Sequence, residues 1–163
     1  MKKLYLVRHA KSSWKYPELS DFERPLNQRG KKDAPKMGKW LRTRKIVPDL
    51  IISSPAVRAS TTAKIFSEIL SYPSEQIRYH DQMYGMGVVT LLDIIKKTEE
   101  SVKRLMLFGH NPEITSLANT LSDTYIDNIP TCGIYALNIK AEKWKDINDK
   151  CSRLDFFQFP KNL

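Results

Sequence analysis

Two histidines and two arginines occupy places in the sequence from which they could act together on a phosphate group. His9 follows the apolar run 5–7, with Arg8 directly before it, and His110 follows the apolar run 105–108. Arg58 comes shortly after a third apolar run, 50–52. Guanidinium groups grip phosphate oxygens bidentately, while one imidazole can serve as a nucleophile and the other as a hydrogen-bond donor. The four side chains therefore predict a phosphoryl-binding site.

The elements that must position these residues alternate between strands and helices. The three apolar runs are typical of buried parallel strands, and apolar residues recur at helical spacing over 34–41, 59–70, 91–95 and 114–121. The segments 133–139 and 153–159 are strand-like and add an edge to the sheet. This order predicts a single α/β domain over residues 1–163, with a three-layer α/β/α architecture and a mostly parallel central sheet closed by an antiparallel edge.

The ends of the strands should bring the charged residues together. In an open α/β sheet, ligands bind beyond the carboxyl ends of the strands, where His9 and His110 are expected. Arg58 falls in the first turn of the helix after strand 50–52, where backbone N–H groups already favour an anion. Residues 11–30 read as a long loop near the site, and Pro35 is expected in or near the first turn of the following helix.

Composition narrows the classes of protein and partner. The chain has 163 residues, 41% of them hydrophobic, and a net charge of +9, which suits a globular protein with anionic partners. Cys132 and Cys151 fit neither a disulfide framework nor a zinc site, so a reducing cytoplasm is expected. The first apolar stretch ends at Arg8, too early for a signal peptide or a membrane span.

Four separate motifs resemble those of the histidine phosphatase superfamily, and more closely its short, SixA-like phosphohistidine phosphatase branch. They occur in family order over about residues 4–121. The resemblance implies a phosphoglycerate mutase-like fold. The motifs are LVRHAKS at 6–12, RPL at 24–26, SSP at 53–55 with Arg58 and Thr62-Ala63, and GHNP at 109–112.

The resemblance also implies roles for these residues. His9 would attack phosphorus and form a phosphohistidine enzyme, which water then hydrolyses, while Arg8 and Arg58 hold the oxygens. His110, expected to be protonated, would donate to the phosphoryl group. No metal or other cofactor is implied, because cationic side chains neutralise the charge. Asn111 is expected to cap the last helix and is a candidate for phosphate contact.

The loop before the first helix has candidate supporting residues. Arg24 either stands behind the site as a second layer of contacts or forms a salt bridge that shapes the loop; the sequence leaves both open. Trp14 and Tyr16 are candidates for the rim of the site, or for simple packing.

One departure from the family pattern bears on the substrate. Many members carry a general-acid Glu in the segment that aligns with 82–86, and Gly85 takes its place here. An alkoxide leaving group needs a proton from such an acid, whereas imidazole, with a pKa of about 6.5 in histidine, leaves readily when its own ring is protonated. Asp21 or Glu23 could supply a substitute acid. The other departure, Ala10 for the more usual Gly, is a small-for-small change.

These observations favour a phosphatase that acts on phosphohistidine displayed by a protein, for instance a phosphotransfer domain. His110 lies 52 positions after Arg58, which leaves no room for a large cap over the site. Small phosphomonoesters or other phosphoramidates are the alternative substrates. A basic phosphate- or nucleic-acid-binding module without turnover is the alternative of a different class. His80 has no partner motif and is expected to be an ordinary residue, and the basic helix near Lys36 is expected to be a solvated face.

Overall fold

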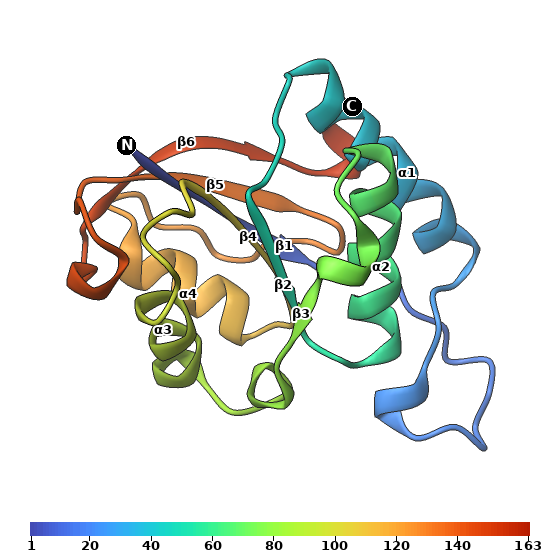
Figure 1. The fold of residues 1–163 in the computed structure, drawn as a ribbon. Helices are drawn as coiled ribbons and strands as arrows, with labels where there is room; N and C mark the ends of the chain where they lie inside the picture. Colours follow the sequence, from blue (N-terminus) through green and yellow to red (C-terminus); the bar gives the residue numbers. More distant parts are fainter.

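A single six-stranded sheet runs through the computed structural model, which describes all 163 residues (Figure 1). Its strand order is β3-β2-β4-β1-β5-β6. The first four strands in this order are parallel, and β5 and β6 pair antiparallel at one edge, as expected from the sequence. The strands are β1 (Lys2–Arg8), β2 (Leu50–Ser53), β3 (Arg78–Tyr79), β4 (Arg104–Gly109), β5 (Ile134–Ile139) and β6 (Ser152–Gln158).

Helices cover both faces of the sheet and complete the three predicted layers (Figure 1). On one face α1 (Gln28–Thr43) packs against α2 (Val57–Ile69), and on the other α3 (Val88–Lys96) packs against α4 (Glu113–Leu121). Alternate residues of β1 enter the two separate apolar cores: Leu4 and Leu6 pack with α3 and α4, whereas Tyr5 and Val7 pack with α1 and α2. Burial on both faces explains why the strands read as continuous apolar runs.

The first helix begins earlier than the sequence suggested. The side chain of Asn27 accepts the backbone N–H of Gly30, which starts α1 at Gln28. The expectation that Pro35 lies in the first turn is therefore wrong, because Pro35 is the eighth residue of the helix. Its ring is half-buried and removes the one N–H that would bond the carbonyl of Lys31. The buried residues Ala34, Met37 and Leu41 hold this stretch helical around it.

The strand register brings three strand ends level. Arg8 at the end of β1 pairs with Gly109 of β4, and Ser53 at the end of β2 pairs with Phe108. The next residues along the chain, His9 and His110, therefore emerge side by side at the carboxyl edge of the sheet. Both cysteines are buried and free, and no helix is both long and apolar enough to cross a bilayer.

Candidate active site

A pocket of about 230 Å³ opens at this carboxyl edge. Its walls contain all four residues that the sequence singled out, and they come from the ends of β1 and β4 and from the first turn of α2. Nine of the ten lining residues are polar or charged, which suits an anionic ligand better than an apolar one. The lining comprises Arg8, His9, Lys11, Ser12, Trp14, Arg24, Arg58, His110, Asn111 and Thr131.

The ring of His9 is held in one tautomer. Its Nδ1 lies 2.7 Å from the carbonyl oxygen of Ala10, and because a carbonyl can only accept, Nδ1 must carry the proton. The Nε2 atom is then left with an exposed lone pair. Burial, followed by the nearby charges of Arg58 and Arg8, lowers the pKa of His9 to about 3. His9 is therefore a neutral imidazole at pH 7, as a nucleophile must be.

The backbone around His9 is fixed by neighbouring elements. The N–H of Ala10 donates to the hydroxyl of Thr62 on α2, at 3.0 Å, and that hydroxyl donates to the carbonyl of Arg58 at 2.7 Å. From the other side, the N–H of Cys132 bonds the carbonyl oxygens of Arg8 and His9. The chain thus cannot shift at His9 without breaking bonds to two other elements.

A glycine lets α1 approach the loop after His9. A Cβ atom at position 30 would lie 2.2 Å from the carbonyl oxygen of Lys11, well inside van der Waals contact. The N–H of Asn27 bonds this same oxygen at 2.9 Å. The start of α1 therefore packs directly on the backbone beyond His9, and only glycine fits at that point.

Three nitrogen atoms around the pocket are buried and have no hydrogen-bond partner in the protein. They are Nε of Arg8, Nε of Arg58 and Nδ1 of His110. Buried donors without partners are rare and call for an explanation, and these three belong to residues of one small polar pocket. Each arginine is also anchored through Nη1: that of Arg8 donates to the carbonyl of Ile129 at 3.0 Å, and that of Arg58 to the carbonyl of Asp21 at 2.7 Å. The arrangement is suited to an oxyanion with several acceptor oxygens.

His110 lies beside His9 but differs from expectation in its charge. The ring centroids are 5.2 Å apart. Burial lowers the pKa of His110 to about 4, and Arg58 and Arg8 act in the same direction. His110 is therefore neutral at pH 7 in this structure, not protonated as the sequence suggested. Its Nε2 is 2.7 Å from the hydroxyl of Ser54, which leaves Nδ1 as the nitrogen available to a ligand.

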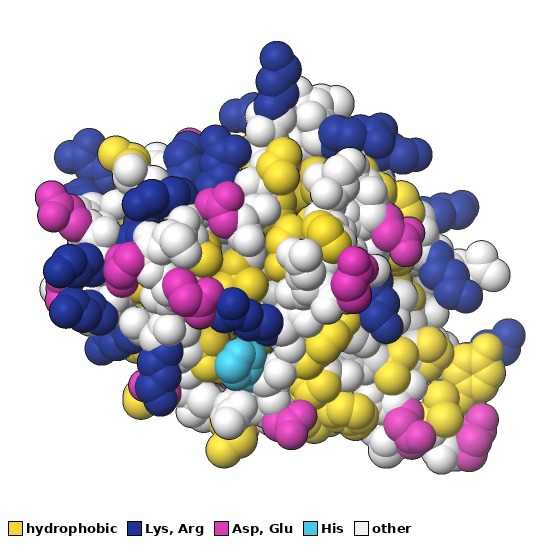
Figure 2. Space-filling model, viewed as in Figure 1, with side chains coloured by type: hydrophobic (Ala, Val, Ile, Leu, Met, Phe, Trp, Pro, Cys, Tyr) yellow, Lys and Arg dark blue, Asp and Glu magenta, His cyan; other side chains and the backbone are white.

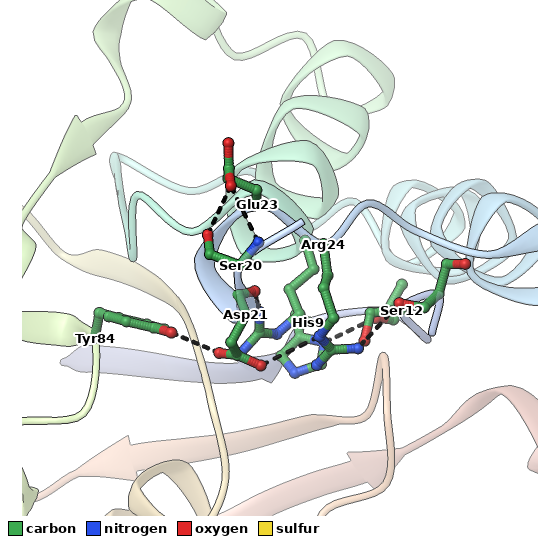
Figure 3. A network of polar contacts seen from close by, with 10 residues as sticks. His9, Ser12, Ser20, Asp21, Glu23, Arg24 and Tyr84 are labelled. Carbon is green, nitrogen blue, oxygen red and sulfur yellow. Dashed lines mark hydrogen bonds and ion pairs between the residues drawn. The ribbon is translucent and has the colours of Figure 1, made fainter. Parts of the chain in front are cut away.

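Asp21 is a structural anchor of the pocket and is poorly suited to act as an acid (Figure 3). Its carboxylate bonds Arg58 at 3.0 Å, Arg24 at 3.2 Å and the hydroxyl of Tyr84 at 2.5 Å. The bond from Tyr84, followed by those from the two arginines, lowers the pKa of Asp21 to about 2. A carboxylate with that pKa has no proton to give at pH 7, so the expectation of a substitute acid at Asp21 is wrong.

Glu23 and Gly85 offer no acid either. Glu23 is held by the backbone and hydroxyl of Ser20, which lower its pKa, and Figure 3 shows it directed away from His9. Gly85 has a φ of 76° and open space where a Cβ would lie. The neighbouring residue, Tyr84, packs its ring edge-on against that of His110, with the ring centroids 5.5 Å apart. The Tyr84 hydroxyl is bound to Asp21, and this bond raises the pKa of Tyr84.

Arg24 and Asn111 line the pocket but are largely committed to the protein. Arg24 donates to the hydroxyl of Ser12 at 2.8 Å, forms the ion pair with Asp21 and stacks on the ring of Trp14 at 3.6 Å. Both of the roles left open are therefore seen: Arg24 shapes the loop through its ion pair, and through Asp21 it supports Arg58 from behind the site. Both amide hydrogens of Asn111 are donated, to Asn128 at 2.7 Å and to the carbonyl of Ile129 at 3.1 Å.

These bonds correct the expectation of phosphate contact for Asn111, because no amide hydrogen remains. Its side-chain oxygen accepts the N–H and hydroxyl of Thr115, so it does satisfy the first turn of α4, although the residue flanking that helix is Pro112.

Sequence reasoning missed several residues that the structure brings to the site. Ser54, Tyr84 and Lys11 carried no assigned role, and neither did the segment 129–132 that precedes the predicted strand 133–139. SSP at 53–55 could have pointed to Ser54, since a polar residue at a strand end tends to face the ligand. His80 lies away from the other two histidines, in the wall of a different pocket formed with Arg78 and Asp93.

Comparison with known proteins agrees with the fold and the family that the motifs suggested. The family model for the histidine phosphatase superfamily (branch 1) matches residues 4–88. The uncharacterized protein Rv1276c of Mycobacterium tuberculosis strain H37Rv is 31% identical over 95% of this chain and all of its own length. The chain belongs to the histidine phosphatase superfamily.

Solved structures place it near one branch of that superfamily. A candidate phosphohistidine phosphatase SixA from Agrobacterium tumefaciens is 29% identical, covers 98% of both chains and superposes with a TM-score of 0.82. A candidate SixA from Nakamurella multipartitia has a TM-score of 0.85 at 24% identity, covering 98% of this chain and 96% of its own. The resemblance to SixA proteins that the motifs suggested is confirmed at the level of fold and family.

Proposed function

We propose that this protein is a metal-independent phosphatase that removes the phosphoryl group from phosphohistidine on a protein, through a covalent phospho-His9 intermediate. The observation that carries the proposal is the set of three buried, partnerless nitrogens on Arg8, Arg58 and His110, which share one pocket with the lone pair of His9 Nε2. Such donors, fixed before the reaction, stabilise developing charge without reorganisation.

The tautomer of His9 serves both halves of the reaction. When Nε2 bonds phosphorus, Nδ1 keeps its proton and the ring becomes a phosphoimidazolium, whose Nδ1–H remains on the carbonyl of Ala10. When water attacks phosphorus, the Nε2–P bond breaks and the electron pair returns to Nε2. His9 leaves as neutral imidazole, so no group has to protonate it, and the proton of the attacking water passes to phosphate or solvent.

The lack of a proton donor favours a phosphoramidate substrate. Asp21 is ionised, Tyr84 holds its proton against Asp21, and position 85 is glycine. A phosphohistidine that is protonated on the ring nitrogen not bonded to phosphorus leaves as neutral imidazole, whereas an alkyl ester would have to expel an alkoxide. The pocket therefore suits a leaving group that brings its own proton.

The surroundings of the pocket favour a protein as the carrier of that phosphohistidine. Exposed aromatic side chains flank the mouth on the loop between β1 and α1, with Trp14 77%, Tyr16 44% and Phe22 37% exposed. In Figure 2 hydrophobic side chains gather at the lower right, over the place of this loop in Figure 1. Aromatic residues around an open polar pocket are typical of a surface that contacts another protein.

Nucleic-acid binding has less support. On the face shown in Figure 2, Lys and Arg side chains are scattered and interleaved with Asp and Glu, and they form no continuous basic stripe. The residues that carry the partnerless nitrogens also line a pocket of only about 230 Å³, too small for a strand of nucleic acid to enter.

The test is phosphate release from a phosphohistidine-bearing phosphotransfer domain and from an alkyl phosphomonoester, with metals chelated. We expect fast release from phosphohistidine, poor release from the ester, and a ³²P-labelled intermediate after acid-free quenching. His9→Asn should abolish label and turnover, whereas His80→Asn, the matched control in another pocket, should retain both. Efficient turnover of the ester would change the assigned substrate class to small phosphoesters. No turnover of either compound would refute the proposal that the protein is a phosphatase.

A further inference from the structure

We infer that Ser54 is a positioning residue that holds His110, which lines the pocket, in the tautomer with its proton on Nδ1, the ring nitrogen that has no partner in the protein. What Nδ1–H would donate to rests on the proposed function, whereas the tautomer itself does not. The two side chains come from different elements, Ser54 from the turn after β2 and His110 from the end of β4.

The contact is short and dry. The Oγ atom of Ser54 lies 2.7 Å from Nε2 of His110, Ser54 is fully buried, and His110 is 7% exposed. The other ring nitrogen, Nδ1, is buried and has no protein partner. Since water does not reach the pair to compensate for a mismatch, the hydrogen-bond inventory of the serine decides which nitrogen carries the proton.

That inventory has one solution in which the Ser54 hydroxyl hydrogen finds an acceptor. The hydrogen left without a protein partner is then the one on Nδ1 of His110, a residue that lines the pocket, whereas Ser54 does not line it. The Ser54 oxygen already accepts the backbone N–H of Ala56 at 3.2 Å, and the hydroxyl hydrogen has His110 Nε2 as its acceptor. If Nε2 were protonated, it would donate to Ser54, and the buried hydroxyl hydrogen would have nowhere to go. Donation from Ser54 to Nε2 therefore fixes the proton of the neutral ring on Nδ1.

The charges around His110 make this hydroxyl necessary. Arg58, Arg8 and Arg24 oppose a positive charge on the ring, and Asp21 is the one group that favours it. A neutral histidine without a fixed tautomer would present an Nδ1 lone pair to a phosphoryl oxygen part of the time, and the two would repel. With Ser54 in place, His110 is a neutral donor at pH 7. The short segment after β2 supplies both Ser54 and, four residues later, Arg58.

The tautomer can be read directly from long-range ¹H–¹⁵N spectra of the imidazole rings of the protein at pH 7, with His110→Asn used to assign the signals. In the wild type we expect a pyrrole-type Nδ1 and a pyridine-type Nε2 for His110. In Ser54→Ala we expect the two ¹⁵N shifts to move toward each other as the tautomers mix. Ser67→Ala, another fully buried serine whose hydroxyl bonds the carbonyl of Lys64, should leave them unchanged.

A wild-type spectrum with the proton on Nε2, or a Ser54→Ala spectrum identical to it, would overturn the inference. The wild-type spectrum decides even if Ser54→Ala fails to fold. Turnover supplies the second readout: kcat for phosphohistidine should fall about 10- to 100-fold with KM little changed, as where a residue that orients a metal-bound imidazole is removed. A protein that shows the expected tautomer but no turnover would refute the proposed function and leave the role of Ser54 intact.

Discussion

The Thr62 hydroxyl links the backbone next to His9 to the carbonyl of Arg58 on α2, so replacing it tests how the site is held. Thr62→Val keeps the shape of this fully buried side chain and removes one oxygen atom. The N–H of Ala10, also fully buried, then loses its acceptor at 3.0 Å. The bond to the carbonyl of Arg58 is lost as well, but that carbonyl keeps its place in the backbone ladder of the helix.

The expected loss of stability follows from the Ala10 N–H, which is left without a hydrogen-bond acceptor. Leaving one buried donor without a partner costs about 1–3 kcal/mol, so the free energy of unfolding should fall by about 2 kcal/mol. For a chain of this size that corresponds to a decrease in Tm of about 4–8 °C. The N–H that loses its acceptor and the carbonyl that orients the His9 ring both belong to Ala10. Turnover should therefore fall about tenfold even where the variant is fully folded.

A matched threonine separates this effect from a general intolerance of valine. Thr98 is 5% exposed, and its hydroxyl donates to the carbonyl of Ile94 at 3.2 Å without accepting from any backbone N–H. Thr98→Val should therefore cost well under half as much and leave turnover unchanged. Urea unfolding of both variants measures the difference. If Thr62→Val is no less stable than Thr98→Val, the unpaired N–H of Ala10 does not destabilise the protein and the reasoning is wrong.

Four further outcomes are expected. The pKa values of His9 and His110 are lowered to about 3 and 4, so the unfolded chain binds protons on these rings near pH 6.5, before the folded chain does. The free energy of unfolding, measured with urea, should therefore fall from pH 6.5 toward pH 4, by at most about 1.4 kcal/mol per pH unit for each ring. The fall should be smaller in a double His→Asn variant. Gly30→Ala forces a Cβ onto a backbone oxygen and should prevent folding or abolish turnover, whereas Gly38→Ala meets only a flexible side-chain atom of Ile69 at 3.1 Å and should be tolerated, as thermal melts will show. Gly85→Glu should cost about 1–2 kcal/mol through its positive φ yet raise alkyl-ester turnover about tenfold or more, with Gly85→Gln as the control that shares the strain but has no acid. Trp14→Ala should raise KM several-fold for a phosphoprotein and not for a small phosphoramidate, whereas Tyr125→Ala, equally exposed, should change neither.

The sequence was informative where a residue's environment depends on near neighbours. An apolar run followed directly by Arg8-His9 or by His110 predicts a buried strand with polar groups at its end, and the parallel register then brings both histidines to one edge. Arg58 in the first turn of α2 follows from the same local logic. The start of α1 was misjudged because Pro35 was weighed above the cap at Asn27, and β3, with two residues, is too short to carry a periodic signal.

Properties that depend on the whole fold could not be read in this way. The charge of His110 is set by its burial and by three arginines from separate segments, so an isolated motif suggests the wrong protonation state. Asp21 looked like an available acid because its sequence neighbours say nothing of Tyr84, which is 63 positions away and supplies the strongest of the bonds that keep it ionised.

The contacts of Asp21 also bear on how the pocket receives a phosphoryl group. Arg58 donates from both Nη atoms to Asp21, to the backbone carbonyl at 2.7 Å and to the carboxylate at 3.0 Å, while its Nε is buried without a protein partner. An anchor of this kind fixes the plane of the guanidinium, so that Nε points in one direction before any ligand arrives. The same carboxylate reduces the net positive charge of the pocket. Under the proposed function, Asp21 would therefore combine a defined guanidinium geometry with a weaker hold on inorganic phosphate, which favours release of that product after each turnover.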